Sequence, residues 1–247
     1  MSGSPALDNY LQKWRRRWPE WQLAELFVPQ GQRELAVTWF ALLQEFDDAF
    51  NISGDPLPAD AKLRWWREEL HAWEGQRSRH PLGRRLGEIT AAWSGLAQSL
   101  EDLPHTRDRD HDIDAARVGL QRYARAIAAI EAVLFPDTES RNDIAEGIVM
   151  QTLAVRCMSL VAPMTSVDSS NGSGSEEDRM SSVSMQKDRA GKLLRHWSEH
   201  AGTLPRRIRS VLVWQRLGRF AAGERRYAHG SLSMLWRIWN MARRRDQ

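Results

Sequence analysis

The chain has 247 residues, of which 42% are hydrophobic, so it can bury the core of one large domain or of two small ones. Its net charge is +3, and its single cysteine, Cys157, excludes an internal disulfide and favours a reducing compartment. Residues 1–11 lack the apolar core of a signal peptide, and no apolar run approaches the length of a membrane span. We therefore expect a cytoplasmic protein, soluble or peripheral at the inner face of a membrane.

Apolar residues recur at a spacing of three to four along most of the chain. In the first helix this spacing places Leu7, Leu11, Trp14 and Trp18 on one face, and Pro19 is expected to end the helix. Further helices are expected over residues 32–50, 59–73, 82–100, 115–135, 143–161, 190–200, 206–222 and 232–245. Because no segment alternates with period two, the pattern predicts an all-α fold of roughly eight helices.

Three of these helices, at residues 32–50, 59–73 and 115–135, carry apolar stripes with many large side chains. A helix with such a stripe buries it against other helices. We expect the three to contact one another and to form part of the wall of a central apolar cavity.

One segment lacks the composition of a packed element. Residues 165–187 are rich in serine, include Asn171-Gly172-Ser173-Gly174 and hold few apolar side chains. Such a segment buries too little apolar surface to offset the entropy of ordering. We predict a disordered linker at 165–187 within a single domain that spans residues 1–247.

An acidic motif follows the apolar run that begins at Phe40. The helix at 32–50 leads into Asp47-Asp48-Ala49-Phe50-Asn51. Asp47 and Asn51 are spaced i, i+4 and share one helix face. Oxygen-bearing side chains at this spacing can hold a Mg²⁺ ion that binds a diphosphate, and Asp48 is a further candidate. Two solvated acids at a helix end remain the alternative interpretation.

Several segments together resemble one enzyme family. They are Leu26-Phe27-Val28-Pro29 with Arg33, the acidic motif at 47–51, Leu63-Arg64-Trp65-Trp66-Arg67-Glu68-Glu69-Leu70, His80-Pro81-Leu82 and Tyr123-Ala124-Arg125-Ala126-Ile127-Ala128. Over residues 26–160 the chain resembles the squalene/phytoene synthases, which join two prenyl diphosphates head to head.

The resemblance implies an isoprenoid synthase fold and a set of site residues. It implies a site for an isoprenoid diphosphate or prenyl lipid, with Mg²⁺ on Asp47 and Asn51, and Asp48 beside them. The resemblance further implies that the 63–70 helix is mainly scaffold. The candidates for lining the cavity are Phe40, Leu43, Tyr123, Ala124, Ile127 and Gln151.

The second acidic motif of that family has no counterpart. Gln151 and Arg156 match approximately, but no acid follows in Cys157-Met158-Ser159-Leu160. Enzymes of this class stabilise the leaving diphosphate with Mg²⁺ ions held between two carboxylate clusters. We therefore expect a weakly active or non-catalytic relative that binds an isoprenoid lipid or a protein partner, with no catalytic residue assigned. The alternative is an active Mg²⁺-dependent transferase that condenses farnesyl- or geranylgeranyl-type diphosphates.

The positive charge gathers at the C-terminal end. From Arg206 onward the chain has eleven arginines and only two acids, Glu224 and Asp246. Several of these arginines lie close in sequence to Trp236 and Trp239, a combination that suits an anionic membrane surface. An ordinary solvated face is the alternative. Because no nucleic-acid-binding motif is present, we expect no nucleic-acid partner.

Overall fold

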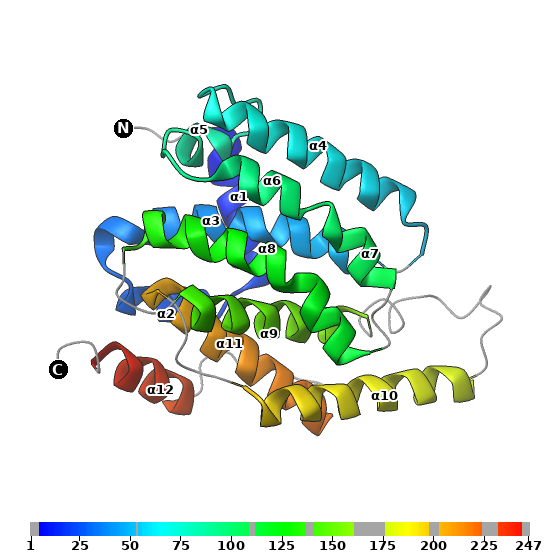
Figure 1. The fold of residues 1–247 in the computed structure, drawn as a ribbon. Coiled ribbons are helices and arrows are strands. Elements are labelled where there is room, and N and C mark those ends of the chain that lie inside the picture. Colours follow the sequence, from blue (N-terminus) through cyan, green and yellow to red (C-terminus); the bar gives the residue numbers. More distant parts are fainter. Residues whose placement is uncertain are drawn as a thin grey trace.

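The computed structural model describes residues 5–52, 54–108, 112–136, 141–160, 176–197, 203–223 and 232–243. Every regular element in these ranges is helical, which confirms the all-α prediction (Figure 1). The elements are α1 (Pro5–Arg17), α2 (Trp21–Ala24), the 3₁₀ turn η1 (Glu25–Phe27), α3 (Gln30–Phe50), α4 (Leu57–Glu74), α5 (Gly83–Leu86), α6 (Trp93–Ser99), α7 (Asp102–Asp108), α8 (Ile113–Leu134), α9 (Arg141–Ser159), α10 (Glu176–Arg195), α11 (Leu204–Ala222) and α12 (Leu232–Arg243).

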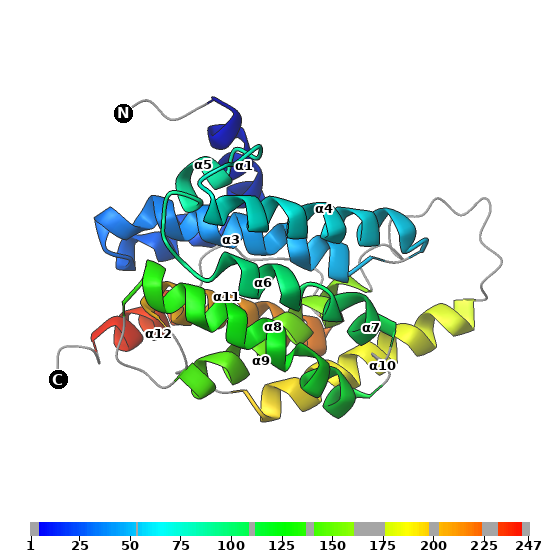
Figure 2. The same cartoon turned by 45° about the horizontal axis from the view of Figure 1, so that its top comes forward.

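Helix α3 is the central element of the described bundle. It contacts α1, α4, α5, α7 and α9. Figures 1 and 2 show α4 and α10 on opposite sides of the body. From Ala36 to Gln44 every residue of α3 is buried, which is the pattern of a helix enclosed on all sides. This enclosure brings polar side chains of α3 into the core together with the apolar ones.

Local sequence signals explain several helix ends. Helix α8 begins after Asp112, whose carboxylate accepts a hydrogen bond from the backbone N–H of Asp114 at 2.9 Å. Helix α11 has Pro205 in its first turn, where a missing N–H costs nothing. It ends at Gly223, whose φ of 74° is the left-handed conformation that glycine adopts without strain.

The prediction of roughly eight helices is wrong, because the described chain forms more and shorter helices. Residues 82–100, expected as one helix, form α5 and α6 with a break between them. The backbone of α5 lies directly on the Trp73 ring: a Cβ on Gly83 would stand 2.5 Å from Trp73 Nε1. The break itself lies at residues 87–92, where Trp93 Nε1 donates to the backbone oxygen of Ile89 at 2.9 Å.

The serine-rich segment divides into two parts. Residues 161–175 lie outside the described residues, so disorder there stays a prediction. From Glu176 the chain is helical as the first half of α10, and the prediction of disorder is wrong for residues 176–187. Helix α10 packs on α9 and α11, and Cys157 Sγ donates a hydrogen bond to the backbone oxygen of Gln186 at 3.0 Å. Tertiary packing, which composition does not reveal, orders this polar helix.

Three predicted helices correspond to α3, α4 and α8. Helix α3 packs on α4, while α6 contacts both α4 and α8. Large side chains join α3 to α8, as where Trp39 Nε1 donates to Glu131 Oε1 at 2.6 Å.

No described helix is long and apolar enough to cross a membrane.

Candidate functional site

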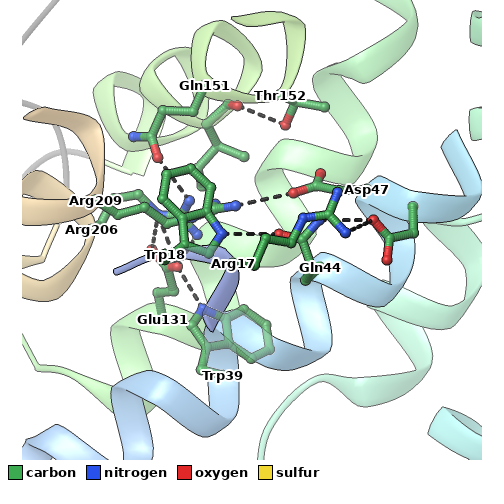
Figure 3. Close-up of polar contacts among 12 residues, drawn as sticks. Arg17, Trp18, Trp39, Gln44, Asp47, Glu131, Gln151, Thr152, Arg206 and Arg209 are labelled. Carbon is green, nitrogen blue, oxygen red and sulfur yellow. Dashed lines mark hydrogen bonds and ion pairs between the residues drawn. The ribbon is translucent and has the colours of Figure 1, made fainter. Parts of the chain in front are cut away.

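Asp47, the best-matched acid of the motif, lies in the last turn of α3 and points into the core. Its residue exposure is only 4%. Its Oδ2 accepts a hydrogen bond from Arg209 Nη2 at 3.0 Å, and Arg209 is equally enclosed (Figure 3). Burial raises the pKa of Asp47, and the Arg209 charge opposes that rise. The carboxylate therefore has one strong partner, supplied by α11.

A second ion pair lies one helical turn earlier on α11. Arg206 Nε donates to both carboxylate oxygens of Glu131, at 3.0 and 3.1 Å, and its Nη2 also contacts that carboxylate. Arg206 Nη1 donates to Gln151 Oε1 at 3.1 Å. Trp39 on α3 donates to the same carboxylate, so this node ties α3, α8, α9 and α11 together (Figure 3).

We refer to Asp47, Glu131, Arg206 and Arg209 as the core ion cluster. It contains two carboxylates and two guanidiniums, so its formal charge sums to zero. The Phe40 ring lies 5.4 Å from the Arg206 guanidinium carbon and 5.3 Å from that of Arg209. Aromatic faces attract cations at these distances. Paired charges and aromatic rings thus pack together around Phe40, and the expected apolar cavity stays a prediction.

Asp48, the second acid of the motif, faces away from the cluster. Arg17 Nη1 lies 2.8 Å from its Oδ1, and both side chains are partly exposed. Gln44 Nε2 also donates to Asp48, at 3.0 Å, while Trp18 Nε1 donates to Gln44 Oε1 at 3.1 Å. These contacts fasten α1 to α3, and they direct Asp48 toward a different partner from Asp47.

The other predicted site residues are brought to the same region of the bundle but differ in environment. Asn51 follows α3, and its Oδ1 is enclosed without a hydrogen-bond partner. Burial is the main cause that raises the pKa of Tyr123 well above its ordinary value, with the Asp47 charge adding to it. Leu43, Ala124 and Ile127 are buried among the core side chains. Gln151 Oε1 accepts the hydrogen bond from Arg206 Nη1.

Arg156, which matches the family motif approximately, binds the end of a helix. Its Nη1 donates to the Phe50 backbone oxygen at 2.7 Å, and its guanidinium carbon lies 4.6 Å from the Phe50 ring centre. Arg107 Nη1 donates to the Ala49 oxygen at 3.3 Å. Cations bound to the last carbonyls of a helix stabilise its C-terminus. Arg156 and Arg107 therefore cap α3 at two backbone carbonyls of the acidic motif.

The motif residues do not fit the expected Mg²⁺ site. Mg²⁺ requires near-octahedral oxygen ligands and usually keeps several waters. Here Asp47 is bonded to Arg209 and Asp48 to Arg17, so each carboxylate is already neutralised by a guanidinium. Among the described residues, no group of three or more His, Cys, Asp or Glu side chains could hold a metal ion.

A second buried carboxylate, apart from the core ion cluster, lies in the 63–82 segment, which contains two of the segments that carry the resemblance. Glu69, at the inner face of α4, accepts hydrogen bonds from the backbone N–H groups of Arg79 at 2.7 Å and His80 at 2.9 Å. Trp73 Nε1, Ser78 Oγ and Arg79 Nε also donate to it, at 3.1, 3.2 and 3.0 Å. Burial alone would raise the pKa of Glu69, but these donors lower it to about 2. The segment fixes the loop after α4.

Sequence reasoning missed Glu131, Arg206 and Arg209, although a signal was present. Like Asp47, which interrupts the stripe 36–40–43–47–50, each is a charged residue within an apolar stripe. Glu131 lies in the stripe 120–124–127–131–134, and Arg206 and Arg209 lie ahead of Val213 and Leu217. A charge at a core position of a helix must be paired. Opposite charges on two such stripes therefore predict a buried ion pair.

Comparison with protein-family models, with curated proteins and with solved structures finds no match to this chain.

Proposed function

We propose that this chain is a non-catalytic, squalene/phytoene synthase-like helical protein that works by binding an isoprenoid lipid or a protein partner. The observation that carries the proposal is the buried ion pair between Asp47 and Arg209. In the family that the chain resembles, the acid at this position would hold Mg²⁺. Here a guanidinium from α11 is its partner.

The energetics of that pair oppose metal binding. A Mg²⁺ ion that bound Asp47 would displace Arg209 and leave its guanidinium unpaired in the core. Breaking a buried ion pair by removing one partner costs about 3–5 kcal/mol. Charge neutrality of the core ion cluster works in the same direction, because a site for Mg²⁺–diphosphate normally has an excess of carboxylates.

The packing around the core ion cluster also bears on the kind of ligand. Phe40, Trp39 and the two arginines occupy the space between α3, α8 and α11, where a prenyl chain would lie in the expected cavity. A prenyl chain could enter there only if these side chains moved apart. The packing therefore favours a partner bound at the outer surface, either a protein or a lipid that contacts the exterior.

The test is an assay for diphosphate release from labelled farnesyl and geranylgeranyl diphosphates with Mg²⁺. We expect the wild-type protein to release diphosphate no faster than protein-free buffer. The Asp47→Asn variant and a control, Asp114→Asn, which alters an exposed acid, should behave like the wild type. Mg²⁺-dependent release that Asp47→Asn abolishes and Asp114→Asn leaves intact would overturn the proposal in favour of an active head-to-head prenyl transferase.

A further inference from the structure

Helix α12 leaves two tryptophans in contact with solvent. Trp236 is 63% exposed and Trp239 is 41% exposed, whereas Ile238 between them is fully buried. The two tryptophans are spaced i, i+3, so they share one helix face, and Ile238 attaches the other side of the helix to the body. Figures 1 and 2 both show α12 at the periphery of the molecule. The exposed tryptophans therefore belong to a helix whose opposite side packs on the body of the protein.

The neighbouring elements expose apolar side chains as well. Helix α12 packs against α2 and η1. Those two elements carry Leu23, which is 40% exposed, and Leu26, which is 62% exposed. We call Leu23, Leu26, Trp236 and Trp239 the Trp–Leu surface. Large exposed apolar side chains gathered on adjoining elements mark an interaction site more often than isolated ones do.

Positive charge accompanies this surface. Arg237 lies on α12 itself, with its guanidinium carbon 4.3 Å from the centre of the Trp214 ring. In the sequence, Arg243-Arg244-Arg245 come directly at the end of α12. A partner of the Trp–Leu surface should therefore combine negative charge with an apolar layer.

We propose that the Trp–Leu surface docks onto the headgroup region of an anionic phospholipid bilayer, with α12 lying in the plane of the interface. Tryptophan suits this position, because its ring is apolar and its indole N–H can bond in the polar layer. Arginines beside it would lie among anionic headgroups. The Trp–Leu surface shares no residue with the core ion cluster, so this inference does not depend on whether the chain is catalytic.

The test is flotation of the whole chain with vesicles of phosphatidylglycerol and phosphatidylcholine, and with vesicles of phosphatidylcholine alone. We expect binding to the anionic vesicles only, and weaker binding when ionic strength rises from about 0.1 M to about 1 M, where the screening length falls from about 10 to about 3 Å. The Trp236→Ala/Trp239→Ala double variant should bind anionic vesicles at least about tenfold more weakly.

A matched pair of leucine variants isolates the surface. Leu26→Ser should weaken vesicle binding, while Leu57→Ser, which alters a leucine exposed on α4, should leave it unchanged. Far-ultraviolet circular dichroism verifies that each variant is folded. Equal binding to both vesicle types, no binding to either, or a double variant that binds like the wild type would overturn the proposal. So would loss of self-association in the double variant without loss of vesicle binding, because the surface would then be a protein interface.

Discussion

Asp47 and Glu69 are both enclosed carboxylates, yet their pKa values move in opposite directions. Burial raises the pKa of Asp47, and Arg209 alone opposes this rise through a direct bond. Glu69 is subject to the same effect, but it accepts hydrogen bonds from two backbone N–H groups and three side chains, so its pKa falls to about 2. The donors to Glu69 together outweigh the effect of burial there, whereas the bond from Arg209 does not outweigh it at Asp47.

The two sites also differ in where their partners come from. All donors to Glu69 lie within eleven residues of it in sequence, on the same helix or in the loop after it. Arg209 is 162 residues from Asp47. The hydrogen-bond donors of Glu69 therefore come from local structure, whereas the partner of Asp47 is present only when α11 packs near α3.

The largest expected effect is that of Arg209→Gln, which leaves Asp47 enclosed without its cation. We expect a loss of about 3–5 kcal/mol in the free energy of unfolding, measured by urea denaturation. Asp47→Asn should also destabilise the protein, and the double variant should lose clearly less than the sum of the two single losses. Additive losses would show that the two side chains act independently and would break the contrast with Glu69.

A pH titration of stability tests the Glu69 site. Because the pKa of Glu69 in the folded protein is below its ordinary value of 4.5, the charged form contributes stability above that value and loses it as pH falls toward about 2. A pKa lowered from 4.5 to about 2 corresponds to at most about 3 kcal/mol of stability. Glu69→Gln should thus be less stable than the wild type at neutral pH, and the gap should close on acidification. Glu88→Gln, at an exposed acid, is the control and should show no gap.

The raised pKa of Asp47 predicts the opposite dependence of stability on pH. A carboxyl whose pKa is raised in the folded state binds its proton more readily when folded, so its contribution to stability declines as pH rises through that pKa. A gap between the wild type and Glu69→Gln that widened on acidification would contradict the sign assigned to Glu69, and a gap between the wild type and Asp47→Asn that widened as pH rises would contradict the sign assigned to Asp47.

The smallest expected effect is that of Arg79→Ala. This side chain is 61% exposed, and removing it takes away one donor to Glu69 while four other hydrogen bonds remain. We expect a loss of no more than about 1 kcal/mol in the free energy of unfolding, as for other partly exposed ion pairs. A loss as large as that of Arg209→Gln would show that the number of donors does not protect the site.

Helix positions were predicted well where apolar stripes are long, as for α3, α4, α8 and α11. They were predicted poorly where tertiary contacts override composition. Residues 87–92 break the expected 82–100 helix into α5 and α6, and packing on α9 and α11 orders the polar first half of α10. Of the candidate site, Asp47, Phe40 and Gln151 lie beside Arg206 or Arg209, and their roles stay predictions; Arg206, Arg209 and Glu131 themselves were overlooked.

By itself, the sequence determined the helical class, the position of the acidic motif at the end of α3, and the concentration of arginine toward the C-terminus. Periodicity and composition are local properties, so they can be read from one segment at a time. Only the tertiary structure decided that Asp47 meets a guanidinium, that Arg156 caps α3, and that Trp236 and Trp239 stay exposed while Ile238 is buried. These outcomes depend on which helix faces which, and that pairing is set by the packing of the whole chain.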